Sequence, residues 1–226
     1  MFDREIKLIG KDNLNKIQSK TILLIGLGGV GGYSLETLIR AGIKNIIIVD
    51  YDIIDITNLN RQILTNTKNI SKYKTEVAKN RILDINPNCN ITIINEKITK
   101  DNINILFNNK IDYIIDACDS IEVKKELIIQ SIKRKIKLIT CCGTGNKLDP
   151  TKFYITDIRK TSYDPIAKIL RKFVIDNKIK DKVIVVSSTE QPKKIEGKIS
   201  SISYVPSIAG ILLTSYVIND IIIDKN

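Results

Sequence analysis

A glycine-rich segment near the N-terminus has the residue types and spacing of a nucleotide-binding turn. It follows an apolar run that begins at Thr21, and its glycines include Gly26, Gly28, Gly29 and Gly31. Glycines allow a tight turn, and the free N–H groups at the start of the next helix attract phosphate. Asp50 ends the following apolar run, about 20 residues later, where an acidic side chain binds ribose hydroxyls. The segment therefore predicts a Rossmann-type nucleotide site.

Charged side chains beyond Asp50 distinguish among nucleotides. Arg61 lies among amides, and Lys74 begins the next helical stretch. A dehydrogenase needs no such cations, because its pyrophosphate already lies on the helix N-terminus, whereas a triphosphate that is cleaved does need them. Asp116 and Asp119 lie at the end of a third apolar run, and a carboxylate there can hold magnesium, which binds through one or two carboxylates plus phosphates. We therefore expect ATP and magnesium. The other nucleotide ligands that we predict nearby are Asp52, Asn58 and Gln62.

Short β-branched runs alternate with amphipathic stretches along most of the chain. This pattern predicts an α/β fold of Rossmann type, with a mainly parallel sheet and helices on both faces. The expected strands are 21–26, 45–50, 91–95, 111–116 and 137–141, and the expected helices are 32–41, 74–85, 101–107 and 122–135. In this arrangement the nucleotide residues follow the carboxyl ends of strands, at one edge of the sheet.

The pattern changes after residue 143. Strands at 152–157 and 183–188 flank a helix at 165–177, and we expect them to form an antiparallel extension at one edge of the sheet. A polar loop at 193–203 precedes an apolar helix at 205–218, which is short for a membrane span and is expected in the core or a dimer interface. We interpret residues 1–226 as a single domain, with a nucleotide-binding core at 1–144 and a basic substrate-binding and dimerisation part at 145–226.

Composition excludes several classes of protein and site. The chain has 226 residues, of which 43% are hydrophobic and 27% charged, as in a folded domain. It contains no His, which excludes Ser-His-Asp triads and His-ligated metals. The four cysteines form no C-x-x-C pair, so no zinc site is expected. Since no signal peptide is recognisable, we expect reduced thiols and a cytoplasmic protein.

The net charge of +11 is concentrated in the second half of the chain. Residues 1–120 carry 16 Lys and Arg against 14 Asp and Glu, whereas residues 121–226 carry 20 against 11. This excess predicts an anionic partner such as nucleic acid. A Lys-rich surface without such a partner would have the same composition.

Taken together, these motifs resemble the adenylating domain of the ubiquitin-activating-enzyme superfamily; they lie at 26–32, Asp50, 58–62, Lys74 and 116–119. The resemblance implies that the protein adenylates a carboxylate with MgATP and releases pyrophosphate. It assigns Asp50 to the ribose, and Arg61 and Lys74 to the phosphates. Asp119 would hold magnesium, so that Arg61, Lys74 and Asp119 are the implied catalytic residues. A homodimer is also implied, in which Arg4 reaches the triphosphate across the interface.

Segments after Gly143 narrow the resemblance to the branch that dehydrates threonylcarbamoyladenosine in tRNA to its cyclic form. They lie at 143–150, 157–161, 164–165, 188–192 and 201–210. The resemblance implies that adenylation of the threonyl carboxylate lets the neighbouring carbamoyl group close the ring. The basic second half would then meet the tRNA backbone. A sulfur-relay protein and a monovalent cation are further partners that the resemblance leaves open.

Three other functions remain open at this point. An adenylyltransferase acting on the C-terminal glycine of a small sulfur-carrier protein would use the same site, but such enzymes usually carry two C-x-x-C pairs. A non-catalytic nucleotide- or tRNA-binding scaffold would not need the phosphate cations, and an NAD-dependent oxidoreductase would rest on the glycine turn alone. Cys141 and Cys142 end a predicted strand near the site, where they are either acyl acceptors or small buried residues.

Overall fold

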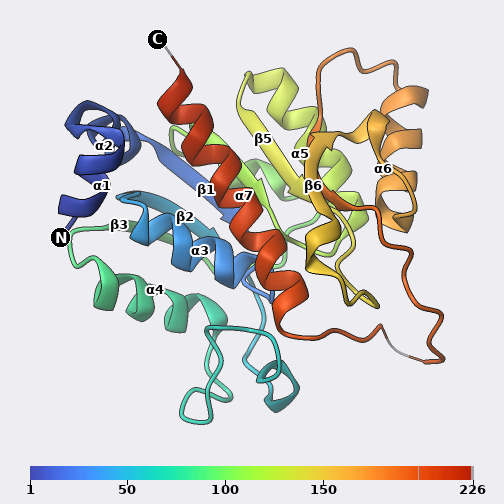
Figure 1. Ribbon diagram of the computed structural model, residues 1–226, viewed down its shortest axis with the longest axis horizontal. Coiled ribbons are helices and arrows are strands. Elements are labelled where there is room, and N and C mark those ends of the chain that lie inside the picture. Colours follow the sequence, from blue (N-terminus) through green and yellow to red (C-terminus); the bar gives the residue numbers. More distant parts are fainter. Residues whose placement is uncertain (198, 225–226) are drawn as a thin grey trace.

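The computed structural model describes residues 1–197 and 199–224, which form a seven-stranded sheet in the order β3-β2-β1-β4-β5-β7-β6 (Figure 1). Neighbouring strands are parallel except for the antiparallel pair β6 and β7. The predicted mainly parallel sheet with an antiparallel extension is therefore confirmed. The strands are β1 (Thr21–Ile25), β2 (Asn45–Val49), β3 (Asn90–Ile94), β4 (Tyr113–Asp116), β5 (Lys137–Cys141), β6 (Phe153–Asp157) and β7 (Ile184–Ser188).

Strand β1 shows why the central strands lack polar alternation. Ile22 and Leu24 pack into one core cluster, whereas Leu23 and Ile25 pack into another. Successive side chains of a strand point to opposite faces, so both faces of β1 are covered. A continuous apolar run is the sequence consequence of that double burial.

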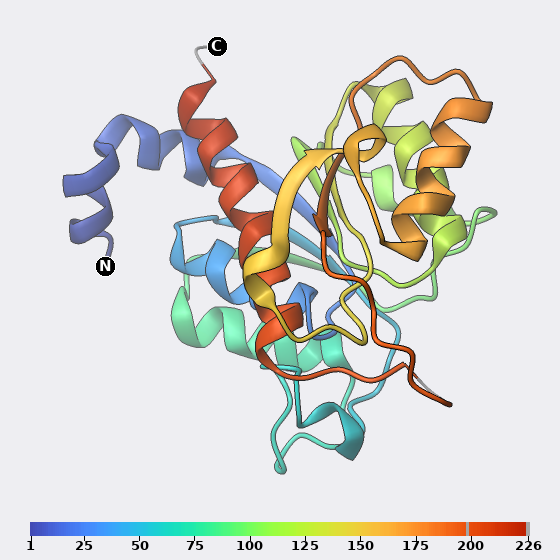
Figure 2. The ribbon, with the colours of Figure 1, turned by 45° about the vertical axis from the view of Figure 1, so that its right-hand side comes forward.

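Helices cover both faces of the sheet, as predicted. One face carries α3 (Gly31–Arg40), α4 (Lys74–Ile85) and α7 (Tyr204–Ile223); the other carries α5 (Ile121–Arg134) and α6 (Pro165–Asp176). Two short helices that the pattern did not predict, α1 (Asp3–Ile9) and α2 (Lys11–Ser19), lie at the end of the molecule opposite α6 (Figure 2). The stretch predicted as a helix at 101–107 is instead the 3-10 helix η2 (Ile103–Phe107). Three further 3-10 helices are η1 (Ile56–Asn58), η3 (Pro150–Lys152) and η4 (Ile158–Lys160).

Helix α7 is longer than predicted and lies in the core. Nine of its residues are buried, and it packs closely along α3. A Cβ atom on Gly210 would lie 2.2 Å from the Val30 carbonyl oxygen, so only glycine allows this approach. By length and composition α7 is the one helix among the described residues that could cross a membrane, but its buried stripe identifies it as a core helix. The predicted loop before it is confirmed except at Lys198, which lies outside the described residues.

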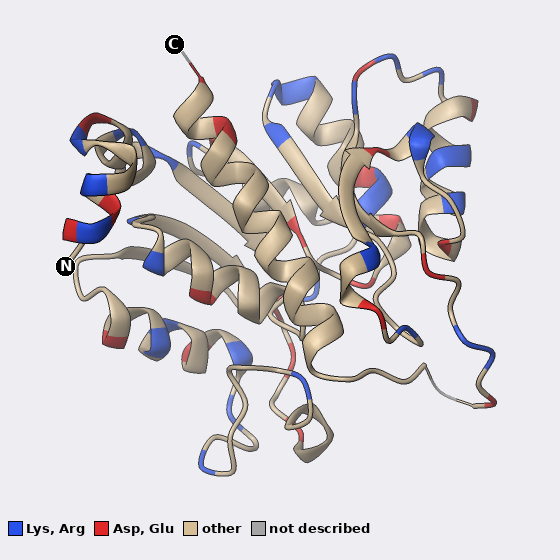
Figure 3. Ribbon diagram, in the orientation of Figure 1, with Lys and Arg blue, Asp and Glu red and all other residues tan. Residues whose placement is uncertain are grey.

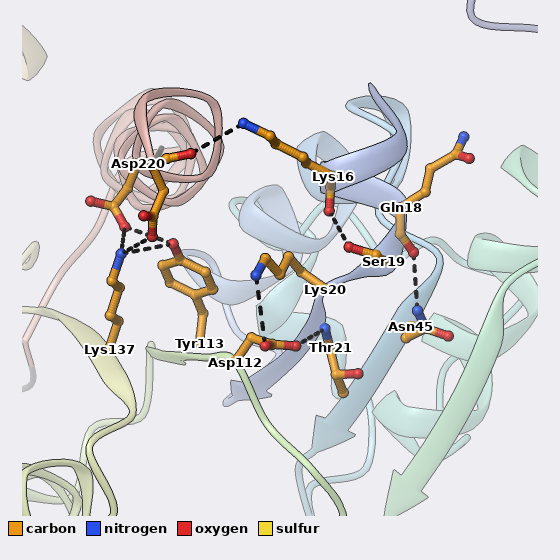
Figure 4. A network of polar contacts seen from close by, with 11 residues as sticks. Lys16, Gln18, Ser19, Lys20, Thr21, Asn45, Asp112, Tyr113, Lys137 and Asp220 are labelled. Carbon is orange, nitrogen blue, oxygen red and sulfur yellow. Dashed lines mark hydrogen bonds and ion pairs between the residues drawn. The ribbon is translucent and has the colours of Figure 1, made fainter. Parts of the chain in front are cut away.

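A polar network fastens the C-terminal end of α7 to the amino ends of β4 and β5 (Figure 4). Lys137 Nζ lies 2.7 Å from a carboxylate oxygen of both Asp220 and Asp224. The Tyr113 hydroxyl donates to Asp220 at 2.6 Å, and Lys16 Nζ donates to the Asp224 carbonyl at 3.1 Å. The network ties α7 and α2 to the edge of the sheet opposite the glycine turn.

Candidate active site

A cavity of about 1020 Å³ lies at the carboxyl ends of β1, β2 and β4 and extends past the end of β5. The strand order changes direction between β1 and β4, and ligands of open α/β sheets bind at such a point. Ten of the twelve site residues predicted from the sequence line this cavity. They are Gly26, Gly28, Gly29, Asp50, Asp52, Asn58, Arg61, Gln62, Lys74 and Asp119.

The glycines of the turn have different surroundings. Gly26 has a φ of +88°, and a Cβ atom there would lie 2.7 Å from the Ala117 carbonyl oxygen. Gly31 lies beneath the cavity wall, where a Cβ atom would lie 1.8 Å from the Gly26 carbonyl oxygen. Gly28 faces open space, since the nearest atom to its Cβ position is Gln62 Nε2 at 4.0 Å. Gly31 thus allows α3 to approach the turn, whereas Gly28 leaves room in the cavity.

Asp50 is held at the end of β2 by main-chain N–H groups. Its carboxylate accepts hydrogen bonds from Leu27 N at 2.6 Å and Asp52 N at 2.8 Å. Burial raises the pKa of Asp50, while Lys74 and the two N–H groups act in the opposite direction. The carboxylate therefore has a fixed orientation beside the glycine turn.

The two predicted cations, Lys74 and Arg61, both line the cavity. Lys74 begins α4, is 5% exposed, and lies 2.6 Å from a carboxylate oxygen of Asp52. Arg61 Nη1 donates to the Thr57 carbonyl at 3.0 Å and to Asn60 Oδ1 at 2.8 Å. The Asp52 side chain is 46% exposed, whereas the Lys74 side chain is 6% exposed.

The loop after β4 places Asp119 in the cavity wall. Asp119 is exposed, and in the part of the chain that the structure describes it has no ion-pair partner. Asp116, three residues earlier, is instead fully buried and paired with Lys124. Of the two carboxylates predicted together at this strand end, only Asp119 is available to a ligand.

Arg4 is a predicted site residue that lies outside this arrangement. It is exposed on α1 and does not line the cavity. Within one chain Arg4 is not part of the site, so the predicted contact with the triphosphate requires a partner chain.

A second part of the cavity was not predicted residue by residue. Lys147 Nζ lies 2.8 Å from Asp164 Oδ2, and both side chains are excluded from solvent although both residues line the wall. Asp164 also accepts a hydrogen bond from Ala167 N, which caps α6. The sequence did point to this region, because Lys147 and Asp164 lie in the segments 143–150 and 164–165 that carry the family resemblance. It did not show that these two residues, 17 positions apart, form an ion pair.

The loop before α7 contributes residues to the cavity wall. Asn146 adopts a φ of +59°. Its main-chain N–H donates to the Ser200 carbonyl at 2.8 Å, and its Oδ1 accepts a hydrogen bond from Ser200 N at 2.7 Å. Asn60 Nδ2 donates to the Ser201 carbonyl at 3.1 Å on the other side. Ile199 and Ser201 line the wall, so this loop joins the nucleotide side to the Lys147 side.

Cys141 and Cys142 line the cavity but are buried. Burial is the main cause that raises the pKa of Cys141 to about 12, and burial also raises the pKa of Cys142. Both are therefore neutral thiols at physiological pH. This favours the interpretation of Cys141 and Cys142 as small buried residues over a role as acyl acceptors.

Comparison with known proteins is consistent with this site. The model of the ThiF family matches residues 2–219. The tRNA threonylcarbamoyladenosine dehydratase of Bacillus subtilis is 38% identical over 99% of this chain and 95% of its own length. The solved structure of the Escherichia coli tRNA N6-threonylcarbamoyladenosine dehydratase in complex with ATP superposes with a TM-score of 0.91, at 33% identity over 97% of this chain and 93% of that one. The complex of the same Escherichia coli enzyme with AMP, which covers 96% and 91% of the two chains at 33% identity, gives a TM-score of 0.89.

Proposed function

This chain belongs to the ThiF family, and we propose that within it the protein is an ATP-dependent tRNA threonylcarbamoyladenosine dehydratase. The observation that carries the proposal is the near full-length similarity to such an enzyme, whose Escherichia coli counterpart has been solved with ATP and with AMP. The resemblance inferred from the motifs is thereby confirmed at the level of family and activity. Ten of the predicted site residues line a single cavity of about 1020 Å³, which supports the proposal.

The reaction needs activation of a poor electrophile. The threonyl carboxylate attacks the α-phosphorus of ATP, pyrophosphate leaves, and the acyl adenylate carries AMP as a good leaving group. The neighbouring carbamoyl group then attacks the activated carbonyl intramolecularly, AMP departs, and the cyclic product is lighter by one water. Arg61 and Lys74 stabilise charge that develops on the phosphate oxygens, and Asp50 holds the ribose. No His or protein nucleophile is required.

Magnesium is the expected companion of ATP, and the residues present fit it. Asp119 offers an exposed carboxylate in the cavity wall, and magnesium is held by one or two carboxylates together with phosphates. No group of three His, Cys, Asp or Glu that could hold a metal alone occurs in the described ranges 1–197 and 199–224. When bound, the ion would neutralise phosphate charge. Asp119 is the residue that would hold it.

A homodimer would complete the site. The side of α7 opposite its buried residues carries Ile208 and Ile211, neither of which is buried, and it is flanked by Leu212, Ile218 and Ile222, which are partly buried against the core. An apolar stripe of this kind suits a two-fold interface. Arg4 supports the same arrangement, because it is exposed and outside the cavity of its own chain.

Mixing of two inactive variants tests the dimer. Arg4→Ala and Asp119→Asn each lose activity alone, but a mixed dimer contains one site with both residues intact. Random exchange should therefore restore roughly a quarter of the wild-type activity. Recovery of none, or a monomer in light scattering with full activity, would remove the shared site.

Product analysis tests the activity itself. The protein is incubated with MgATP and tRNA that carries threonylcarbamoyladenosine, and the nucleosides are examined by mass spectrometry for the product lighter by one water. A parallel reaction supplies small sulfur-carrier proteins and measures ATP–pyrophosphate exchange. Exchange with a carrier protein and no cyclic nucleoside would show that the protein is an adenylyltransferase instead.

A further inference from the structure

Lys and Arg residues are frequent in and around α6, on the side of the molecule away from the N-terminal helices (Figure 3). Residues 159–182 contain eight Lys and Arg against three Asp, a net charge of +5 in 24 residues. One of the three acids, Asp164, is buried and paired with Lys147. The other two, Asp176 and Asp181, are exposed, so the outer surface of this segment keeps an excess of positive charge.

Two of the eight cations serve the fold. Arg159 Nη1 lies 3.0 Å from Asp157 Oδ2 and donates to Asp157 Oδ1 at 3.1 Å, and the Arg159 guanidinium also donates to the main-chain carbonyls of Ile179 and Asp181. Arg171 Nη1 donates to the Thr161 carbonyl at 2.6 Å. These two guanidinium groups fix η4 and the segment after α6 in place, and they present little charge to a partner.

The other six cations are exposed, and none has an ion-pair partner among the described residues. We call them the α6 surface: Lys160, Lys168, Lys172, Lys178, Lys180 and Lys182. Lys168 and Lys172 are four residues apart and so lie on one face of α6, while Ala167, Leu170 and Val174 bury the opposite face. Six unpaired ammonium groups on one side of a domain repel one another unless a polyanion neutralises them.

The α6 surface begins where the cavity ends. Asp164, Pro165 and Ile166 start α6 and line the Lys147 side of the cavity, away from the glycine turn. From that mouth α6 runs outward for 12 residues, about 18 Å at 1.5 Å per residue. A substrate that places its reactive group in the cavity and continues as a polyanion would lie along this helix.

We propose that the α6 surface binds the tRNA backbone and that the modified nucleoside enters the cavity past the start of α6. The proposal rests on the dehydratase function and specifies its RNA-binding face. The charges contact phosphates, so they add affinity without reading sequence. Because Lys168 and Lys172 do not line the cavity, they affect the binding of tRNA and not the chemical step.

Matched charge removal tests the proposal. The variant K168Q/K172Q is compared with K79Q/K110Q, which removes two exposed lysines from α4 and from the loop before β4. We expect K168Q/K172Q to raise the Kd for tRNA by roughly tenfold and to reduce the slope of log Kd against log salt by about 1 to 2. The control should behave as wild type, and both variants should bind ATP normally.

Steady-state kinetics, together with tRNA binding, test the α6 surface separately from the dehydratase function on which the proposal rests. K168Q/K172Q should raise the KM for tRNA and leave kcat at saturating tRNA unchanged. Equal Kd values for both variants would overturn the α6 surface even if the wild type forms cyclic product. If the wild type forms none but K168Q/K172Q still loses tRNA affinity, the surface stands and the proposed reaction fails.

Discussion

Lys124 Nζ lies 3.0 Å from Asp116 Oδ2, and neither side chain is more than 1% exposed. The same ammonium group donates to Thr140 Oγ1 at 3.1 Å and to the Cys141 carbonyl at 2.9 Å. Burial opposes the charge, but the Asp116 carboxylate outweighs it and raises the pKa of Lys124. This ion pair joins α5 to the ends of β4 and β5, and the loop that carries Asp119 starts from it.

Removal of Lys124 should destabilise the protein strongly. Lys124→Met leaves Asp116 charged, buried and unpaired, which costs about 3–5 kcal/mol of the free energy of unfolding. Urea denaturation measures the loss. The double variant K124M/D116N should lose less than K124M alone, because no unpaired charge remains. If the free energy of unfolding of Lys124→Met equals that of the wild type within experimental error, the Lys124–Asp116 ion pair does not have this structural role.

Glycine-to-alanine changes should distinguish Gly31, which is tightly packed, from Gly28, which faces open space in the cavity. Gly31→Ala places a methyl group 1.8 Å from the Gly26 carbonyl oxygen, so α3 must shift and several kcal/mol of stability should be lost. Gly28→Ala meets nothing closer than 4.0 Å and should keep the wild-type Tm. Thermal unfolding of both compares them. Similar Tm values for the two would contradict the packing difference.

Asp119→Asn should nearly abolish turnover. Loss of a magnesium ligand removes stabilisation of transition-state charge worth several kcal/mol, or roughly 10²- to 10³-fold in rate. The tRNA affinity should stay close to normal, because a carboxylate adds nothing to the binding of a polyanion. Formation of cyclic nucleoside measures the first effect and filter binding the second. Asp84→Asn, which neutralises an exposed carboxylate on α4, is the control, and wild-type turnover in Asp119→Asn would refute the assignment.

Glu36 should contribute to the loss of folding stability at acidic pH. Burial acts to raise its pKa, but hydrogen bonds from Arg81 and Arg40 outweigh it, and the pKa of Glu36 is lowered. In this pH range the native state therefore binds fewer protons than the unfolded state. The resulting stabilisation is fully present above the ordinary pKa of Glu, and it is lost as the pH falls through the lowered pKa of Glu36 in the folded protein. Both arginines are about half exposed, so the effect is on the order of 1 kcal/mol. Glu36→Gln should flatten the stability profile between about pH 5 and pH 3; an unchanged profile would contradict this.

Cys141 should be chemically quiet in the folded protein. With burial raising its pKa to about 12, on the order of one thiol in 10⁴ is ionised at pH 8. Alkylation by iodoacetamide, followed by peptide mass spectrometry, should therefore be far slower than in the urea-unfolded chain. Cys141→Ala and Cys142→Ala should each retain turnover near the wild-type value. Loss of turnover with an unchanged Tm would instead indicate a role as acyl acceptor.

Features that depend on neighbouring residues could be predicted from the sequence. The glycine turn, Asp50 at the end of β2 and Lys74 at the start of α4 follow from local backbone chemistry, since strands, turns and helix starts are specified over a few residues. The parallel sheet follows as well, because double burial leaves continuous apolar runs. Helices α1 and α2 were missed because they bury few residues, Leu14 and Ile17 of α2 being the only ones among the described residues of the two helices.

Pairing between distant segments was decided by the tertiary structure. Asp116 and Asp119 look alike in the sequence, yet one is buried on Lys124 and the other faces the cavity. Lys124 and Lys147 also look like surface lysines until the fold brings a carboxylate to each. The physical reason is that a charge leaves water only when a partner is supplied in the same place, and chain topology, not local sequence, brings that partner there.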